Sequence, residues 1–341
     1  MILSATNKRI LEKTSLKKGW NAFKIHLSFW VSKLLRRNII WGLPYAFSLE
    51  PTTSCNLRCP ECPSGLRSFT RNTGSIALDN FKTIIDQYKA TALHLNLYFQ
   101  GEPYLNKSFL DLVKYASEQK IFTSTSTNAH YLTPENAEKT VLSGLDKLII
   151  SIDGTTQETY QNYRVGGTLE KVISGTKNIL AAKQKLNSKY PLVYFQFLVV
   201  KPNEHQIDEI LNLGKELGVD EVTLKSAQIY DYKNGNELIP TKEKYSRYIK
   251  QQNGEYKLKY ELKNECWKMW HSNVVTWDGD VVPCCFDKDA TYKMGNLAIN
   301  SLHEIWKSNK YQQFRKQLWK DRESIDICQN CTEGAKIFNE V

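Results

Sequence analysis

Between about residues 45 and 230, short apolar runs alternate with longer segments in which apolar residues recur every three or four positions. The short runs predict buried strands and the longer segments predict amphipathic helices. Their alternation is typical of a parallel sheet with helical crossovers, so the predicted fold class is α/β. We expect six strands, at Ala46–Glu50, Leu93–Phe99, Ile121–Thr125, Lys147–Ile152, Leu192–Val200 and Glu221–Lys225.

Polar residues gather where five of these predicted strands end. In sheets of this type the chemistry lies at the carboxyl ends of the strands. Turn residues are also polar, so one such cluster has an ordinary explanation, but five at equivalent positions favour a shared site. The clusters are Cys55–Cys62, Gln100–Pro103, Ser126–Asn128, Asp153–Gly154 and Lys201–Asn203.

Local signals predict several helix ends and one hairpin. Asp79 and Thr133 are expected to be N-caps, because their side-chain oxygens can accept a hydrogen bond from the first helical turn. Pro134 suits the first position of a helix. Asp278-Gly279 is a strong two-residue hairpin signal, and Ser301–Trp319 predicts one amphipathic helix.

Four segments follow from these patterns. Residues 43–230 carry the strand–helix alternation, and the polar residues 231–265 are expected to form an irregular connector. Residues 266–341 begin a second unit with the hairpin, and residues 1–42 form an N-terminal extension. A second unit of about 75 residues has little core of its own, so we expect a metal to stabilise it.

The N-terminal extension predicts an amphipathic helix. Such a helix usually packs on its own domain. The alternative is contact with a membrane or with a lipid-like substrate. The apolar positions at helical spacing are Trp20, Phe23, Leu27, Trp30, Val31 and Leu34, and Lys24, Lys33, Arg36 and Arg37 lie elsewhere around the helix.

Composition limits the class of protein. The 341 residues are 41% hydrophobic and 24% charged, which excludes a collagen-like or wholly disordered chain. No apolar run is long enough to cross a bilayer and no signal peptide is recognisable, so we expect a cytoplasmic location with membrane association left open. The net charge of +10 favours an acidic partner, an anionic substrate or a membrane surface without choosing among them.

Eight cysteines in a chain without an export signal indicate metal binding or catalysis in preference to disulfides. Cys55, Cys59 and Cys62 form a CxxxCxxC run that lacks a fourth ligand. A structural zinc site is normally closed by four protein ligands, whereas a four-iron cluster held by three Cys keeps one iron open for chemistry. No His occurs in residues 63–92, which weakens the zinc interpretation.

The CNLRCPEC sequence at Cys55–Cys62 resembles the signature of the radical S-adenosylmethionine superfamily. The resemblance covers roughly residues 45–230 and implies a partial (β/α)6 barrel of the TIM type. It also implies a [4Fe-4S] cluster on Cys55, Cys59 and Cys62, whose open iron is chelated by the amino and carboxylate groups of S-adenosylmethionine. The residue before the third Cys is Glu61, where the family often has an aromatic residue.

Weaker matches place further residues near this cofactor. Gln100-Gly101-Glu102-Pro103 is similar to the family's GGEP segment, which implies that Gly101 and Glu102 receive the cofactor's amino group. Asn128 matches a strand-end position near the ribose. Ser151 and Arg164 belong to SIDG-like and YR-like elements of one branch, although Arg164 also has the ordinary interpretation of a helix cap or an ion-pair partner.

The C-terminal cysteines resemble the auxiliary-cluster extensions of the same superfamily, the SPASM domain and its shorter twitch form. The matching spacing is Cys266-x12-Gly279-x4-Cys284, followed by Cys328-x2-Cys331. Only ten residues follow Cys331 and none of them is Cys, so the form with two auxiliary clusters cannot be completed. The resemblance implies one auxiliary [4Fe-4S] cluster with Cys266, Cys284, Cys328 and Cys331 as ligands.

Cys285 is left over and has three interpretations. It can replace Cys284 as a ligand, it can be a small buried apolar residue, or it can face the cavity. A cavity-facing thiol could return a hydrogen atom to a substrate radical, a role that some radical epimerases of this superfamily give to Cys.

The resemblance implies that reductive cleavage of S-adenosylmethionine gives a 5'-deoxyadenosyl radical, and that the auxiliary cluster accepts a further electron. We therefore expect a two-electron oxidation, with dehydrogenation of a hydroxyl-bearing carbon as the leading case. The alternatives are epimerisation through Cys285, modification of a peptide, and a zinc-stapled binding protein without catalysis. No nucleic-acid recognition motif is present.

Other partners follow from the resemblance and the charge. The family implies a flavodoxin- or ferredoxin-like electron donor, and the substrate is left open as a small molecule, a lipid-linked molecule or a peptide. Gln196 and Lys201, on or just after the fifth predicted strand, are candidate substrate contacts.

Overall fold

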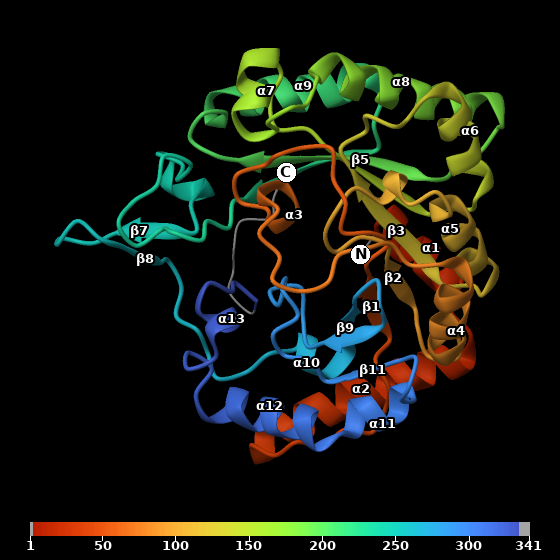
Figure 1. Cartoon of the computed structure of the whole chain (residues 1–341), viewed down its shortest axis with the longest axis vertical. Coiled ribbons are helices and arrows are strands. Elements are labelled where there is room, and N and C mark those ends of the chain that lie inside the picture. Colours follow the sequence, from red (N-terminus) through yellow and green to blue (C-terminus); the bar gives the residue numbers. More distant parts are fainter. Residues whose placement is uncertain (1–2, 334–341) are drawn as a thin grey trace.

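Six parallel strands form the centre of the computed structural model, which describes residues 3–333. They follow one another along the chain and across the sheet, and curve into a partial barrel (Figure 1). All six predicted strands are therefore confirmed, with ends that differ by a few residues. They are β1 (Ala46–Leu49), β2 (His94–Asn96), β3 (Phe122–Thr127), β4 (Lys147–Ser151), β5 (Leu192–Val199) and β6 (Glu221–Ser226).

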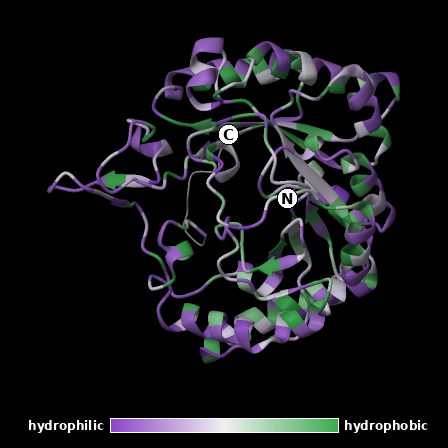
Figure 2. Cartoon of the chain, viewed as in Figure 1, coloured by the Kyte–Doolittle hydropathy of each residue, from purple (hydrophilic) through white to green (hydrophobic). Residues whose placement is uncertain are grey.

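Amphipathic helices cover the outside of this sheet, and hydrophobic and hydrophilic segments alternate along them (Figure 2). Thr133 caps its helix as predicted, since its side chain accepts a hydrogen bond from Asn136 N. The prediction for Asp79 is wrong: Ala77 is the N-cap, and Asp79 lies in the first turn. The helices are α4 (Leu78–Tyr88), α5 (Phe109–Glu118), α6 (Pro134–Leu142), α7 (Gln157–Tyr163), α8 (Leu169–Lys185) and α9 (Ile207–Leu217).

Short elements occupy the loops at the carboxyl ends of the strands and the connector. The loop after β1 contains α3 (Pro63–Leu66), and the 3-10 turns η1 (Pro103–Leu105) and η2 (Glu204–Gln206) follow β2 and β5. The connector is more ordered than its polar sequence predicts. It contains η3 (Glu243–Tyr245) and a two-stranded antiparallel sheet of β7 (Tyr248–Lys250) and β8 (Tyr256–Leu258).

The C-terminal segment extends the barrel sheet, because β9 (Ser272–Val275) pairs in parallel with β1, Ala46 opposite Ser272. The predicted hairpin is confirmed. It joins β9 to β10 (Asp280–Val282), which also pairs with β11 (Gly295–Asn296). Gly279 has a φ of 88°, a left-handed conformation that favours glycine. The resulting sheet has nine strands, and one hydrophobic core continues from the barrel into this segment.

Four helices accompany this hairpin. The prediction of one helix over Ser301–Trp319 is wrong, because the helix is interrupted at Ser308. The Ser308 side chain caps the second of the two resulting helices. The helices are α10 (Lys268–His271), α11 (Leu302–Lys307), α12 (Asn309–Lys320) and α13 (Asp326–Gln329).

The N-terminal extension forms α1 (Ala5–Glu12) and α2 (Leu16–Leu35). Helix α1 lies at the amino end of the barrel, where Arg9 and Lys13 both pair with the fully buried Asp146, at 2.7 and 2.5 Å. Helix α2 contacts α10 and runs beside α11 and α12 (Figure 1). It packs on its own domain as expected, but not through its apolar stripe, which is exposed.

Candidate functional site

The three cysteines of the CxxxCxxC run lie in the loop between β1 and α3, at the carboxyl end of the barrel. All three line one cavity of about 180 Å³. The other residues that the sequence placed near a cofactor line the same cavity. They are Gly101, Glu102, Asn128, Ser151 and Arg164.

Glu102 is buried in this wall and held by hydrogen bonds. Its carboxylate accepts from Thr127 Oγ1 at 2.7 Å and from Asn128 N at 2.8 Å. Burial raises the pKa of Glu102 to about 7, while these hydrogen bonds oppose the shift. The preceding Gly101 has a φ of 75°, and a Cβ there would lie 2.3 Å from Thr52 O, so no other residue fits.

Arg164 connects a buried carboxylate to the cysteine loop. Its Nε donates to Asp153 Oδ2 at 2.5 Å, and its Nη1 lies 3.8 Å from Cys59 Sγ. Asp153 has no exposed side-chain surface and also accepts a hydrogen bond from Leu198 N. Arg164 is therefore an ion-pair partner, which was one of the two roles expected for it without a cofactor. The ion pair also positions the guanidinium next to the Cys59 thiol.

Two further contacts fix the walls of the cavity. Ser151 and Ser126 hydroxyls lie 3.3 Å apart, on neighbouring strands. Glu61, where the family often has an aromatic residue, accepts a hydrogen bond from Tyr230 N at 2.8 Å. The departure from the family pattern thus ties the cysteine loop to the segment after β6.

The donor set of the first cysteine group suits an iron–sulfur cluster better than a single ion. Within residues 3–333, no three His, Cys, Asp or Glu side chains are close enough together to hold one metal ion. A cluster spreads its ligands further apart, and three thiolates from one loop are a common way to hold one. Burial raises the pKa of Cys55 to about 11 and also raises that of Cys59, so these thiols need a bound cationic centre or Arg164 to ionise.

The second cysteine group gathers Cys266, Cys284, Cys328 and Cys331. Cys284 is half-buried, and the other three are buried. Burial raises the pKa of Cys284, and the charges of Cys331 and Cys266 raise it further, which places these thiols near one another. The buried Arg322 donates to Cys331 Sγ at 3.3 Å. The charges of these four thiols act on one another and on Arg322, and their role as auxiliary ligands stays a prediction.

Cys285 is exposed, so its interpretation as a buried apolar residue is wrong. Lys268 Nζ lies 3.8 Å from its Sγ. Burial lowers the pKa of Lys288. The nearby Cys62 and Cys285 act in the opposite direction and raise it. Lys288 therefore lies near Cys62 of the first cysteine group and near Cys285, the neighbour of Cys284.

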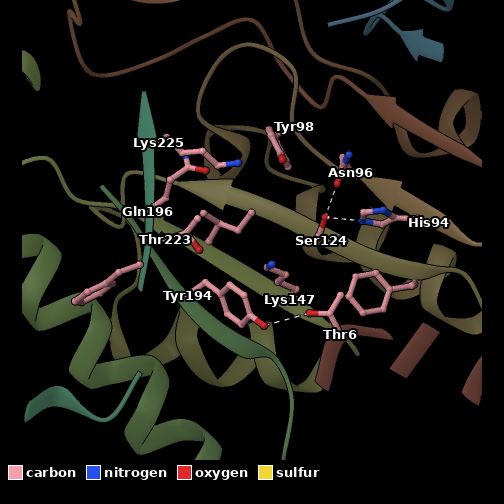
Figure 3. A pocket seen from close by; sticks show the side chains of 13 residues that line it. Thr6, His94, Asn96, Tyr98, Ser124, Lys147, Tyr194, Gln196, Thr223 and Lys225 are labelled. Atoms are coloured by element: carbon pink, nitrogen blue, oxygen red, sulfur yellow. Dashed lines mark hydrogen bonds between the residues drawn. The ribbon is translucent and has the colours of Figure 1, made fainter. Parts of the chain in front are cut away.

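A second cavity, of about 250 Å³, fills the barrel lumen (Figure 3). It shares Tyr98 and Gln196 with the cysteine cavity, so the two are adjacent. The candidate contact Gln196 is in both, whereas Lys201 is exposed and lines neither.

The sequence analysis did not predict that the barrel lumen is lined by polar side chains. Alternate residues of each strand face inward, and many are polar, as in His94 and Asn96 of β2 and Ser124 of β3. Ser124 donates to Asn96 Oδ1 at 2.6 Å and lies 3.1 Å from His94 Nε2. TIM barrels usually fill this space with branched apolar side chains. The signal was present in the period-two pattern of polar residues within the strands.

Comparison with known families decides what these sites are. Residues 49–214 match the model of the radical SAM superfamily, where SAM is S-adenosylmethionine. Residues 266–332 match SPASM, an iron-sulfur cluster-binding domain. The chain is a radical SAM enzyme with a C-terminal SPASM domain. The predicted family and enzyme class are confirmed, and so are the kinds of cofactor: a [4Fe-4S] cluster with S-adenosylmethionine, and auxiliary iron–sulfur chemistry.

Known proteins resemble this radical SAM enzyme over most of its length. It is 29% identical over 297 residues to the tungsten-containing aldehyde ferredoxin oxidoreductase cofactor-modifying protein of Pyrococcus furiosus, covering 78% of this chain and 82% of that one. Its fold is similar to BtrN in complex with AdoMet and 2-DOIA, with 20% identity, a TM-score of 0.55 and coverage of 87% and 96%. SuiB of Streptococcus suis bound to S-adenosylmethionine has 15% identity, a TM-score of 0.64 and coverage of 88% and 75%. The two structures confirm the partial-barrel fold.

The lumen of this radical SAM enzyme is positively charged. No Asp or Glu lines it, whereas Lys147 and Lys225 both do. Lys147 Nζ lies 3.6 Å over the ring of Tyr194. Lys225 makes no ion pair within residues 3–333, and its pKa is lowered first by burial and then by Arg247 and Lys268. Arg247 and Lys268 are therefore near Lys225, and Lys268 itself pairs with Glu333 at 3.3 Å.

Proposed function

We propose that this enzyme oxidises a polar small molecule by two electrons at a carbon that carries a hydroxyl group. When bound, the [4Fe-4S] cluster with S-adenosylmethionine supplies a radical that takes a hydrogen atom, and the auxiliary cluster supplies a one-electron acceptor. The substrate then loses one hydrogen atom to the adenosyl carbon, followed by one electron and one proton, and its alcohol becomes a carbonyl. One externally supplied electron is consumed in forming methionine and 5'-deoxyadenosine.

The observation that carries this proposal is the second cysteine group, three buried thiols and one half-buried thiol whose charges act on one another beside Arg322. A cluster held by four Cys has no open iron, which suits electron transfer. In this proposal Cys266, Cys284, Cys328 and Cys331 hold that cluster. Cys285 is exposed beside Lys268 whereas Cys284 is half-buried, which supports Cys284 as the ligand of the adjacent pair.

The remaining roles are assigned from the first cavity. Cys55, Cys59 and Cys62 hold the catalytic cluster, and Arg164 balances its charge. Glu102 and the backbone at Gly101 receive the amino group of S-adenosylmethionine, because a carboxylate pointing into a buried wall attracts an ammonium group. Asn128 and Ser151 contact the rest of the cofactor from neighbouring strands.

The lumen supports a small polar substrate over a peptide or a lipid tail. Its volume of about 250 Å³ is below the range of most drug-sized ligand pockets. An apolar chain in the lumen would leave the polar lining residues without hydrogen-bond partners, and each such buried group costs free energy. Lys225 and Lys147 favour a substrate with an anionic or strongly hydrogen-bonding group. A lipid-linked substrate stays compatible if only its polar head enters.

Replacement of Lys225 by Gln tests this substrate assignment. Loss of a charge-assisted contact is expected to raise KM about tenfold with little change in kcat, and Lys225→Arg should recover most of the affinity. Lys139→Gln, at an exposed position on α6, is the control and should change neither constant. Equal kinetics for Lys225→Gln and wild type would exclude Lys225 from substrate binding.

Product analysis tests the reaction. Reduced enzyme incubated anaerobically with S-adenosylmethionine and candidate hydroxyl compounds is expected to give a product two mass units lighter than the substrate. The exposed Cys285 supports epimerisation as a second candidate. In that case the product has the substrate's mass in H2O, is one mass unit heavier in D2O because one deuterium is bound at the reacting carbon, and is lost in Cys285→Ala. Oxidation would survive that replacement.

The proposal extends to partners and location. A flavodoxin- or ferredoxin-like protein supplies the first electron, and the net charge of +10 suits such an acidic donor. Eight free cysteines and oxygen-sensitive clusters fit a cytoplasmic location. Peripheral contact with the membrane belongs to the same proposal and is supported by the exposed face of α2.

A further inference from the structure

Helix α2 exposes its apolar residues instead of burying them. Six of them are between 43% and 95% exposed. At 3.6 residues per turn they fall within about 80° of the helix circumference, so they form one continuous stripe. Trp20 and Phe23 stack on each other within it, with ring centroids 5.4 Å apart. The residues of this α2 stripe are Leu16, Trp20, Phe23, Leu27, Trp30 and Leu34.

The opposite side of α2 makes the contacts with the protein. Its buried residues are centred about 170° from the middle of the stripe. Several of them are polar and satisfied: Asn21 donates to Leu43 O at 2.8 Å, and Lys18 Nζ donates to Lys120 O at 2.7 Å. Ser32 Oγ accepts from Trp270 Nε1 at 3.2 Å. These contacts fix the rotation of the helix, so the stripe cannot turn inward without breaking them.

Positive charge surrounds the stripe. Between Lys13 and Leu49 the chain has six Lys or Arg residues and no Asp or Glu, and of these only Lys18 is buried. Lys17, Lys24 and Arg37 make no ion pair within residues 3–333, whereas Lys33 is engaged with Glu265. Helix α12, which runs beside α2, adds the exposed Lys310, Lys316 and Lys320 and no acid to this side of the molecule (Figure 1).

We propose that α2 lies on an anionic lipid bilayer, with its stripe among the acyl chains and its lysines and arginines at the lipid phosphates. An apolar stripe with Trp at the boundary and basic residues along its sides is the pattern of an interfacial helix. Anionic lipid is the occupant that matches both the apolar stripe and the surrounding cations. A hydrophobic protein surface would cover the stripe but would leave the cations unpaired. No helix within residues 3–333 is long and apolar enough to cross a bilayer, so the contact is peripheral.

Vesicle flotation of the full-length, anaerobically purified enzyme tests this proposal. The stripe variant is Trp20→Ser, Phe23→Ser and Trp30→Ser, three exposed positions that carry no part of the core. The matched control replaces apolar residues that are exposed elsewhere, Leu142→Ser and Ile299→Ser. Point substitutions are preferable to removal of residues 1–42, because α1 and α2 supply buried contacts to the barrel.

Wild type and control are expected to float with vesicles rich in phosphatidylglycerol, and the stripe variant is expected to bind at least about tenfold more weakly. A charge variant, Lys17→Gln with Lys24→Gln, should lose about fivefold per cation, and high salt should weaken wild-type binding. Equal flotation of stripe variant and wild type overturns the proposal. So does a wild-type dimer that the stripe variant converts to monomer in lipid-free solution, since the stripe would then face a second copy. Activity in solution decides the proposed oxidation separately.

Discussion

Replacement of Cys55, Cys59 and Cys62 together by Ala is expected to abolish cleavage of S-adenosylmethionine. The three side chains line one cavity and are the proposed ligands of the catalytic cluster, so no open iron would remain to bind the cofactor. The measurement is 5'-deoxyadenosine formed by the anaerobically reconstituted protein with a reductant. Iron content is expected to fall from about eight to about four per chain, because the second cysteine group is intact.

Cys285→Ala is the matched control for this experiment. It removes an exposed thiol that is not a proposed ligand, so cleavage and iron content should stay at the wild-type level. Survival of cleavage in the triple variant would contradict the assignment of the catalytic cluster. Loss of all iron in that variant would show that the first group also holds the second cluster, or that the fold is lost.

Replacement of Asp153 by Asn is expected to destabilise the protein by about 3–5 kcal/mol, the usual cost of removing one partner of a buried ion pair. Asn retains an acceptor for Leu198 N but removes the charge opposite Arg164, so the guanidinium loses its ion-pair partner. The measurement is the free energy of unfolding in urea, taken on protein without clusters so that cluster binding does not contribute.

Glu135→Gln is the control for the ion-pair experiment. It breaks an exposed pair with Lys139 on the surface of α6, where a change within about 0.5 kcal/mol is expected. If the two variants lower the unfolding free energy by the same amount, Asp153 is not the anchor of Arg164 that the geometry indicates.

The strands were predictable because their apolar runs are short and bounded by polar residues, so burial on both faces fixes their position. Helix starts were predictable only where the cap makes its own bond, as at Thr133. The prediction of an N-cap at Asp79 failed because two backbone contacts fix the chain just before the helix. They are the bridge between Thr52 and Ser75 and the hydrogen bond from Ile76 N to Pro51 O, and α4 then begins at Leu78.

The candidate site was predictable where a short motif carried it, and less so elsewhere. The cysteine spacing led to both cysteine groups, whereas the lumen depends on which alternate strand residues face inward after the sheet curves. The orientation of α2 was not predictable for a different reason. Periodicity shows that a helix is two-sided, but the bonds of Asn21, Ser32 and Lys18, made to distant segments, decide which side packs.

The pairing of β9 with β1 restricts how substrate reaches the lumen. A hinge motion that swings the SPASM region away from the barrel would have to break a backbone ladder of four residue pairs and split one core. The β7–β8 sheet is also tied to the barrel, since Tyr248 packs with Leu57, Cys59 and Val200, so we expect substrate entry to depend on the loops at the carboxyl ends of the strands. If the two cysteine groups hold the two clusters as proposed, this ladder keeps the two clusters at a nearly fixed separation while substrate enters.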